Sequence, residues 1–376
     1  MNAHRDAAGS AHLRLALLAG AMSWAMGGGV MAAPKFSQVE VFASGHDGYH
    51  TFRIPAIVVT KKGTLLAFCE GRKTTGRDHG DIDLVLKRSF DGGRIWTPMQ
   101  IVHEEGRTQK ITIGNPCPVV DQSTGTIWLT FCRNNDRVFV TKSTDDGASW
   151  ARPKEITQDV KPASWTWYAT GPVHGVQLNS GRLLIPCDHR ERAKGRTMFS
   201  HVFYSDDHGA SWKLGGSLAE KTDECTAVEA ADGRVYLNMR SYHGKNRRAY
   251  AWSKDGGATW SDVRLDEALI EPVCQASVIR FTDAKRHGKN RVLFSNPASK
   301  QRVRMTVRVS YDECKTWPVS KVIHAGPAAY SDLCVLPDKT ICCLYERGKR
   351  SAYETITLAR FNLEWLTNGA DTLKAK

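Results

Sequence analysis

The chain has 376 residues, of which 24% are charged and 41% hydrophobic, the balance of a globular protein with ample core-forming material. This composition excludes a disordered chain, a collagen-like chain and a small disulfide-stapled scaffold. The sequence contains no purely apolar stretch of about 18 residues, the length that a membrane-spanning helix needs, so an integral membrane bundle is also excluded. The 52 basic and 39 acidic residues give a formal charge of +13, which favours anionic partners without choosing between nucleic acid and a small acidic substrate.

Residues 1–33 are predicted to be a secretory signal peptide. Arg5 and Arg14 precede an apolar run over residues 15–30, and small residues follow it. We therefore expect export to the periplasm, the cell surface or the medium, with one folded domain at residues 34–376. The alternative is a disordered leader that is not cleaved and leaves the protein cytoplasmic.

Ten cysteines raise the question of a disulfide framework. Cys69, Cys132 and Cys187 end apolar runs, where a cysteine behaves as a small buried hydrophobe. No C-x-x-C pair occurs, and no histidine has ligand spacing from a cysteine. These positions favour buried free thiols and no metal site, with one or two bridges as the alternative.

An eight-residue box, S-x-D-x-G-x-S/T-W, recurs along the chain. Three full and two degenerate copies occupy residues 143–150, 205–212, 253–260, 89–96 and 310–317. Ile95 replaces Ser/Thr in one degenerate copy, and Cys314 replaces Gly in the other. We interpret each box as a turn in which Asp caps backbone amides, Gly takes a positive φ and Trp covers a hairpin.

Six short turns run in phase with the boxes, each between two apolar segments. Alternation and β-branched residues mark these segments as strands, and such short turns make them antiparallel hairpins. The turns lie at residues 62–64, 124–126, 180–182, 232–234, 289–291 and 338–340. Six similar all-β units predict one closed domain, a six-bladed β-propeller of four-stranded antiparallel blades.

Polar residues recur at the start of the strand before each turn and at the end of the strand after it. Both positions lie at one edge of a hairpin, so these side chains should gather at one end of the propeller axis. The set is Arg53, Glu70, Arg72, Asn115, Arg133, Gly171, Asp188, Arg190, Glu224, Arg240, Gln275, Asn296, Tyr330 and Glu346. The planar, charged guanidinium groups of its converging arginines can form paired hydrogen bonds with a carboxylate or phosphate.

The segment Phe52-Arg53-Ile54-Pro55, together with the five boxes, resembles the signature of the exo-sialidases (neuraminidases). The resemblance covers nearly all of the chain after the leader, up to residues 361–365. It implies a six-bladed propeller that hydrolyses terminal α-linked sialic acids from glycoproteins, glycolipids or oligosaccharides. It implies no cofactor and no metal, and nucleic acid and the membrane are not expected partners.

Carried over motif by motif, the resemblance assigns roles to eight residues. Five are implied to bind the substrate or to orient a binding group: the carboxylate-binding triad Arg53, Arg240 and Arg302, the nearby Arg72, and Glu346, which orients Arg53. Three are implied to be catalytic: Tyr330 as nucleophile, Glu224 as its proton-accepting partner and Asp78 as acid/base. Sialidases differ in this way from glycosidases that use two carboxylates, and they retain the anomeric configuration.

Neighbouring residues compete for three of these assignments. The competing sets are Arg302 with Arg304, Glu224 with Glu229, and Asp78 with Asp81 or Asp83. Glu229 lies five positions after Glu224, and an odd spacing places two residues on opposite faces of a strand. Trp165, Trp167 and Tyr168 could flank the leaving group or the glycerol side chain, or could pack against the next blade. A glycan-binding propeller without catalysis and a trans-sialidase are the alternative functions.

Overall fold

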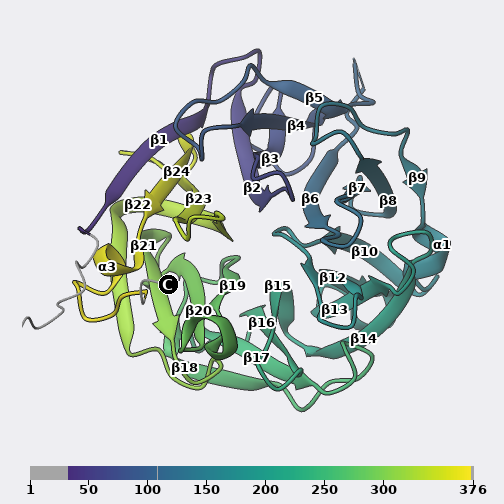
Figure 1. Cartoon of the computed structure of the whole chain (residues 1–376). Helices are drawn as coiled ribbons and strands as arrows, with labels where there is room; N and C mark the ends of the chain where they lie inside the picture. The colour runs from purple at the N-terminus through teal and green to yellow at the C-terminus, as the bar shows by residue number, and fades with distance from the viewer. Residues whose placement is uncertain (1–32, 108, 374–376) are drawn as a thin grey trace, which may run out of the picture. The chain divides into compact units, whose positions relative to one another are not determined.

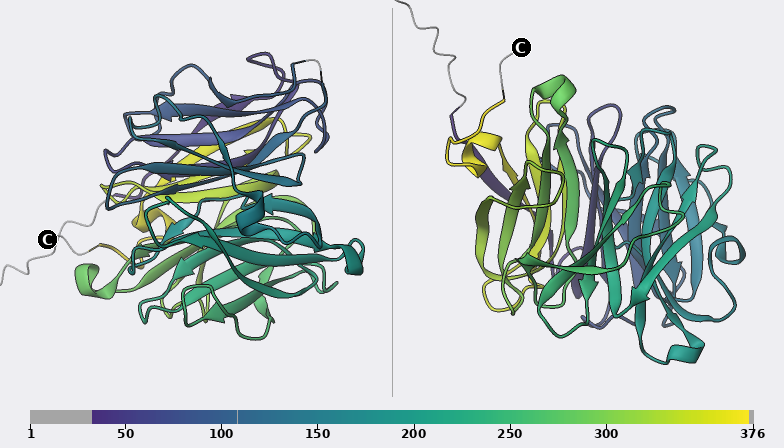
Figure 2. Two further views of the ribbon diagram at one scale, coloured as in Figure 1. Left: turned by 90° about the vertical axis from the view of Figure 1, so that its right-hand side faces the viewer. Right: turned by 90° about the horizontal axis from the view of Figure 1, so that it is seen from below.

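Antiparallel hairpins make up nearly all of the computed structural model, which describes residues 33–107 and 109–373. Residues 1–32, nearly all of the predicted leader, lie outside these residues. The sheets are arranged around a central axis (Figure 1). Seen from the side, the strands run between two faces on which the connecting loops lie (Figure 2).

Three of the sheets have four strands each. The first contains β2 (Thr51–Val59), β3 (Leu65–Arg72), β4 (Ile82–Ser89) and β5 (Gln100–His103). The second contains β6 (Ile113–Val120), β7 (Ile127–Arg133), β8 (Arg137–Ser143) and β9 (Lys154–Glu155). The third contains β15 (Thr222–Glu229), β16 (Val235–Ser241), β17 (Arg247–Ser253) and β18 (Arg264–Ile270).

The two remaining sheets are larger. The five-stranded sheet contains β10 (Trp165–Thr170), β11 (Val176–Gln177), β12 (Leu183–Glu191), β13 (Met198–Ser205) and β14 (Lys213–Glu220). The seven-stranded sheet has the order β1 (Phe36–Ala43), β24 (Thr355–Phe361), β23 (Ile341–Arg347), β22 (Val319–Val335), β21 (Val303–Ser310), β20 (Arg291–Pro297) and β19 (Ser277–Thr282). Single helical turns lie in the connections at α1 (Thr157–Val160), η1 (Arg192–Lys194) and α2 (Ala284–His287), and α3 (Leu363–Leu366) follows β24.

All six predicted hairpins are present, and the prediction of an all-β, propeller-like arrangement of antiparallel sheets is confirmed. Six separate four-stranded sheets are not observed. Four sheets stand alone, and β22 joins the rest of the strands into one sheet because it runs unbroken for 17 residues. Its first half pairs with β21 and its second half with β23.

The boxes form the turns that their residue types predict. In each copy the Ser hydroxyl bonds the Asp carboxylate at 2.8–2.9 Å and accepts a hydrogen bond from the backbone N–H at the Gly position. The four glycines there have φ between 79° and 93°. Cys314 adopts the same left-handed conformation, with φ of 64°, although it carries a side chain.

Ile95 lacks a hydrogen bond that the other four boxes make. In those boxes the Ser or Thr hydroxyl donates to the second carboxylate oxygen of the Asp, as Thr259 does to Asp255 at 2.6 Å. Ile95 has no hydroxyl, and its side chain is 75% exposed. We expect Ile95→Thr to restore the bond to Asp91 and to raise the free energy of unfolding by about 1 kcal/mol. An unchanged urea midpoint would contradict this expectation.

The core lies between adjacent sheets, where apolar residues of the inner strands interdigitate. Leu65 and Val85 of the first sheet, for example, pack with Leu344 and Leu358 of the seven-stranded sheet. All ten cysteines are buried and none is in a disulfide, and the burial of Cys69, Cys132 and Cys187 agrees with their positions in apolar runs. In the described ranges no helix is long and apolar enough to span a membrane, and no three His, Cys, Asp or Glu side chains cluster as metal ligands.

Candidate active site

Eight of the fourteen residues predicted to gather at one end of the axis line a cavity there of about 200 Å³. They come from the starts of inner strands and from the ends of their hairpin partners, as the register predicts. The members of that set that line it are Glu70, Arg72, Asn115, Asp188, Arg190, Glu224, Arg240 and Tyr330, and Asp78 and Trp167 line it as well. Arg53, Arg302 and Glu346 are not in the lining and lie beside Tyr330 instead. Residues from separate sheets therefore meet at one mouth.

Irregular pairing marks the inner strands where they reach this cavity. The register shifts beside Arg53, Asn115, Glu224 and Tyr330, each time within the hairpin that carries the residue. Asn115 has a positive φ of 58°, as does Ile54 with 62°. Such bulges re-aim side chains out of the strand alternation, which turns these polar groups toward the axis.

Tyr330, on β22, contacts two charged groups across the axis. Its hydroxyl donates a short hydrogen bond to Glu224 Oε1 of β15, and Arg240 Nη1 lies 3.3 Å from the phenol oxygen. The same Arg240 nitrogen lies 2.8 Å from Glu224 Oε2. Burial, followed by the Glu224 charge, raises the pKa of Tyr330 well above its ordinary value. In the free protein the phenol is therefore neutral and already bonded to a proton acceptor.

Arg53 is held by the buried Glu346. Arg53 Nε lies 2.7 Å from Glu346 Oε1, and the backbone N–H groups of Ile54 and Tyr330 donate to the two oxygens of the same carboxylate. The Arg53 guanidinium lies over the Tyr330 ring, 5.2 Å from its centroid. Glu346 thus fixes Arg53 relative to Tyr330, as the resemblance implies.

Arg302 reaches the same tyrosine from the segment before β21. Its guanidinium lies 5.6 Å from the Tyr330 ring centroid, and its Nη1 donates to the Tyr353 hydroxyl at 2.7 Å. The Tyr353 ring in turn lies 4.0 Å from the guanidinium of Arg53. The competing Arg304 is exposed and makes no contact with these groups among the described residues. The geometry therefore favours Arg302.

Asp78 lies at the rim, in the loop between β3 and β4. Its side chain is 71% exposed, with Arg72 Nη1 at 2.9 Å and Arg53 Nη1 at 3.8 Å. Partial burial would raise the pKa of Asp78, but the guanidinium groups of Arg72 and Arg53 outweigh it, so the net pKa is lowered. The competing Asp81 and Asp83 form ion pairs with Lys73 outside the cavity lining.

Several predicted residues lie away from the cavity. Arg133 pairs with Glu105 at 2.6 Å, Asn296 accepts from Arg308, and Gln275 bonds backbone carbonyls deeper along the axis. Glu229 accepts from the N–H of Asn179 at the opposite end of β15. These four side chains satisfy structural partners and do not reach the mouth.

The three aromatic residues of β10, the first strand of the five-stranded sheet, divide between the two interpretations. Trp167 lines the cavity and donates from Nε1 to Asp188 at 3.0 Å. Trp165 and Tyr168 are buried, with Trp165 stacked on His189 at 3.4 Å between ring centroids. Trp167 alone of the three is placed to meet a bound ligand.

Comparison with known proteins agrees with this arrangement. The model of the BNR repeat-like domain family matches residues 63–343. A sialidase of Micromonospora viridifaciens is 36% identical over 361 residues, which cover 89% of this chain and 55% of that protein. An exo-alpha-sialidase of Aspergillus fumigatus is 34% identical over 372 residues, which cover 86% of each chain. The chain belongs to the sialidase family.

A solved structure of the same family supports the fold. The Hadza microbial sialidase Hz136 superposes with a TM-score of 0.81 at 29% identity, covering 88% of this chain and 69% of its own. This sialidase-family chain spans about half the length of the Micromonospora sialidase and most of the length of the Aspergillus one.

Two cavity residues of this sialidase-family chain, Asp223 and Tyr242, and the nearby Tyr353 did not stand out in the sequence. Asp223 lies 3.6 Å from Arg240 Nε, and the hydroxyl of Tyr242 accepts from Arg240 Nη2 at 2.7 Å. Tyr353 joins Arg302 to Arg53. Asp223 is adjacent to Glu224, and Tyr242 is two residues from Arg240. Their closeness to residues with assigned roles is the only feature of the sequence that points to them.

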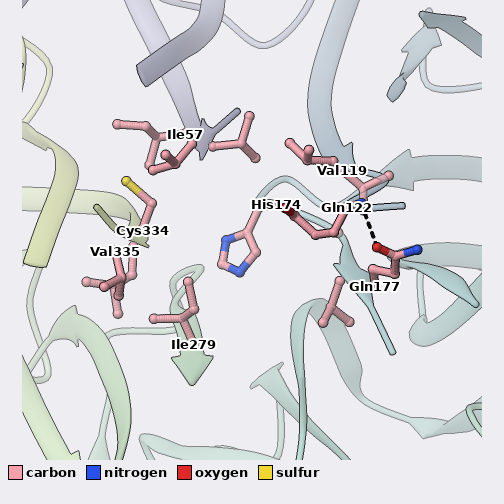
Figure 3. Close-up of a pocket in the computed structure, with 14 residues that line it drawn as sticks. Ile57, Val119, Gln122, His174, Gln177, Ile279, Cys334 and Val335 are labelled. Atoms are coloured by element: carbon pink, nitrogen blue, oxygen red, sulfur yellow. Dashed lines mark hydrogen bonds between the residues drawn. The ribbon is translucent and has the colours of Figure 1, made fainter. Parts of the chain in front are cut away.

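The opposite end of the axis opens into a separate, largely apolar pocket of about 250 Å³ (Figure 3). His174 lies at its centre, among Ile57, Ile279 and Cys334. Behind it, His174 Nδ1 lies 2.6 Å from Asp332 Oδ1. This buried pair separates the two mouths of the sialidase fold.

Proposed function

We propose that the chain is a retaining exo-α-sialidase that removes terminal α-linked sialic acids from glycans. The observation that carries the proposal is the hydrogen bond from Tyr330 to Glu224 beside Arg53, Arg240 and Arg302. The names of the relatives support sialic acid as the substrate class.

The three arginines are proposed to bind the substrate carboxylate. Guanidinium groups form paired hydrogen bonds with a carboxylate and so fix its orientation as well as its position. Arg53 is held in place by Glu346 and Arg302 by Tyr353 before any ligand arrives. Fixing the sugar in this way would place its anomeric carbon against the Tyr330 hydroxyl and lower the entropic part of the barrier.

A neutral tyrosine suits attack on a carbon that carries a carboxylate. An ionised Asp or Glu about 4 Å from that carboxylate would be repelled by about 4 kcal/mol at an effective dielectric near 20. Because the pKa of Tyr330 is raised, its proton must leave during attack, and Glu224 is already positioned to accept it. The phenol oxygen would then bond the anomeric carbon as the glycosidic bond breaks.

Asp78 is the proposed acid and base. It would donate a proton to the departing glycoside oxygen and then take one from the water that cleaves the tyrosyl intermediate, which gives net retention. In the free protein the arginines hold Asp78 ionised. A substrate carboxylate bound to Arg53 would neutralise part of this positive field and so favour the protonated form of Asp78.

The test is proton NMR of the purified chain with α2,3- and α2,6-linked sialyllactose. We expect free sialic acid, first as the α-anomer and later equilibrated to the β-anomer. First release of the β-anomer would refute retention. Transfer of sialic acid to added lactose without free sugar would favour a trans-sialidase, and binding without any product would favour a non-catalytic propeller.

Asp223 is expected to make substrate affinity depend on pH. Burial raises its pKa to about 6, with Arg240 opposing and Glu224 adding to the rise. Below that pH Asp223 is neutral and Arg240 attracts an anion fully; above it the added negative charge weakens the attraction. We expect KM for a sialoside to rise roughly three- to tenfold between pH 5 and pH 7.5. In Asp223→Asn this rise should disappear, and a profile identical to that of the wild type would contradict the assignment.

We also infer that the fold has six blades. Dividing the seven-stranded sheet within β22, at Gly326-Pro327, yields two four-stranded sets, β19–β22 and β22–β23–β24–β1. The strand β1 pairs with β24 and so joins the two ends of the described chain in one blade (Figure 1). Export through the leader at residues 1–33 remains part of the proposal on the strength of its sequence pattern.

A further inference from the structure

A hollow on the sheet β15–β18 lies outside the candidate active site. Its volume is about 530 Å³, and it is formed by β17, the box after it and the start of β18. Arg234, at the entry to β16, is part of its lining, whereas Arg240 of the active site lies near the other end of that strand. The hollow and the active site are thus at opposite ends of β16 and can be occupied together.

Two aromatic side chains form the wall of this hollow. Tyr250 and Trp252 are two residues apart on β17 and so share a face, and both are partly exposed. Trp260 of the box also lines the hollow, but its ring packs into the apolar cluster on the other face of the sheet, where Nε1 donates to the Gly216 carbonyl at 3.2 Å. The buried Tyr236 supports the first two rings from beneath, with its ring centroid 5.7 Å from Tyr250 and 5.1 Å from Trp252. The aromatic face is therefore fixed before a ligand arrives.

The charges around this face are mainly positive. Arg234 stacks on Trp252 at 4.4 Å and is paired with Asp232. Lys254 and Arg264 also line the hollow, and neither side chain makes an ion pair or hydrogen bond within the described residues. The exposed Asp262 adds one carboxylate that can accept from hydroxyl groups. The site therefore offers ring faces, two unpaired cations and one acceptor.

We propose that this hollow is a second binding site for an anionic glycan. Sugar rings bearing a carboxylate or sulfate match both the flat apolar faces and the free cations. Single-stranded nucleic acid is a poorer match, because it requires a basic groove that follows several phosphates and Asp262 would repel one. This binding role goes beyond the proposed hydrolysis. The hollow would hold one part of a glycan chain while the active site, at the other end of β16, hydrolyses a terminal sugar.

A similar hollow on the second sheet provides a matched control. It contains Trp128 and Trp212 with the exposed Arg152 and Lys154, but both tryptophans are buried, with at most 9% exposure. The double variant Arg152→Ala/Lys154→Ala therefore removes the same charge as Lys254→Ala/Arg264→Ala from a place without accessible rings.

The experiment measures binding of a chondroitin sulfate hexasaccharide, which contains no sialic acid, by isothermal titration calorimetry. A hyaluronan hexasaccharide, which carries carboxylates but no sulfate and no sialic acid, is the second probe and separates carboxylate from sulfate ligands. We expect Lys254→Ala/Arg264→Ala to weaken binding of at least one probe fivefold or more, Trp252→Ala to weaken it tenfold or more, and the control double variant to bind as the wild type does. Turnover of a small fluorogenic sialoside should stay unchanged in all three variants.

Other outcomes overturn the proposal. Absence of binding by the wild type, equal loss in the control variant, or full binding by Lys254→Ala/Arg264→Ala would each do so. Tighter binding of an oligo-dT decamer than of either glycan would assign the hollow to nucleic acid instead. A chain that binds the hexasaccharide through this hollow but hydrolyses no sialoside would refute the proposed function while leaving the second site in place.

Discussion

Replacing Tyr330 by Phe is expected to lower kcat for sialoside hydrolysis about 10³-fold or more, because the proposed nucleophilic oxygen is removed. The ring itself remains, so its packing against Arg53 and Arg302 is kept. Binding should survive, since the three guanidinium groups are unchanged. The measurement is steady-state and single-turnover release of a fluorogenic aglycone, together with the affinity for a non-hydrolysable sialoside.

Tyr242→Phe is the matched control for this prediction. Its hydroxyl also contacts Arg240, at 2.7 Å, but it makes no contact with Glu224. Losing it should alter KM modestly and leave kcat within about tenfold of the wild type. If Tyr330→Phe retained a tenth of normal kcat, or if both variants lost kcat equally, Tyr330 would not be the nucleophile. Equal melting temperatures would show that neither result reflects unfolding.

Local patterns were sufficient to predict the hairpins but not the way in which sheets join. The turns at Gly63, Gly125 and Gly233 each carry a positive φ between alternating strands, and all three hairpins form as expected. Gly326-Pro327 has the composition of a break, because proline cannot donate to a sheet ladder. Yet β22 continues through it, with the pairing partner changing from β21 to β23. Which neighbour a strand pairs with depends on contacts distant in sequence.

The candidate site shows the same division. Counting residues from the hairpin turns predicted that Tyr330, Glu224 and Arg240 lie at the same end of the axis, and the structure brings them into contact there. Register failed for Asn296 and Gln275, whose side chains bond interior partners. It could not identify Tyr353, which reaches Arg302 from a loop that has no fixed offset from any turn. Strand alternation predicts which end of a blade a residue occupies, whereas bulges and loops decide where its side chain points.

The interior of the axis contains a further group that positions Tyr330, the proposed nucleophile. Asp332, two residues after Tyr330, is fully buried and accepts hydrogen bonds from three separate segments. The donors are the N–H of Ile57 on β2 at 2.8 Å, the ring of His174 at 2.6 Å and the hydroxyl of Ser277 on β19 at 2.8 Å. One carboxylate thus ties β22 to the first sheet, to the five-stranded sheet and to β19 at the edge of its own sheet.

Asp332→Ala is expected to reduce the free energy of unfolding by about 4 kcal/mol, because several buried donors would lose their acceptor together. For a domain of this size that corresponds to a fall in melting temperature of roughly 6 °C. Asp332→Asn keeps one carbonyl oxygen and should lose about half as much. Because β22 carries Tyr330, both variants should also weaken turnover at temperatures where they remain folded. A melting temperature for Asp332→Ala within about 2 °C of the wild type would show that the sheets are held at the axis by packing alone.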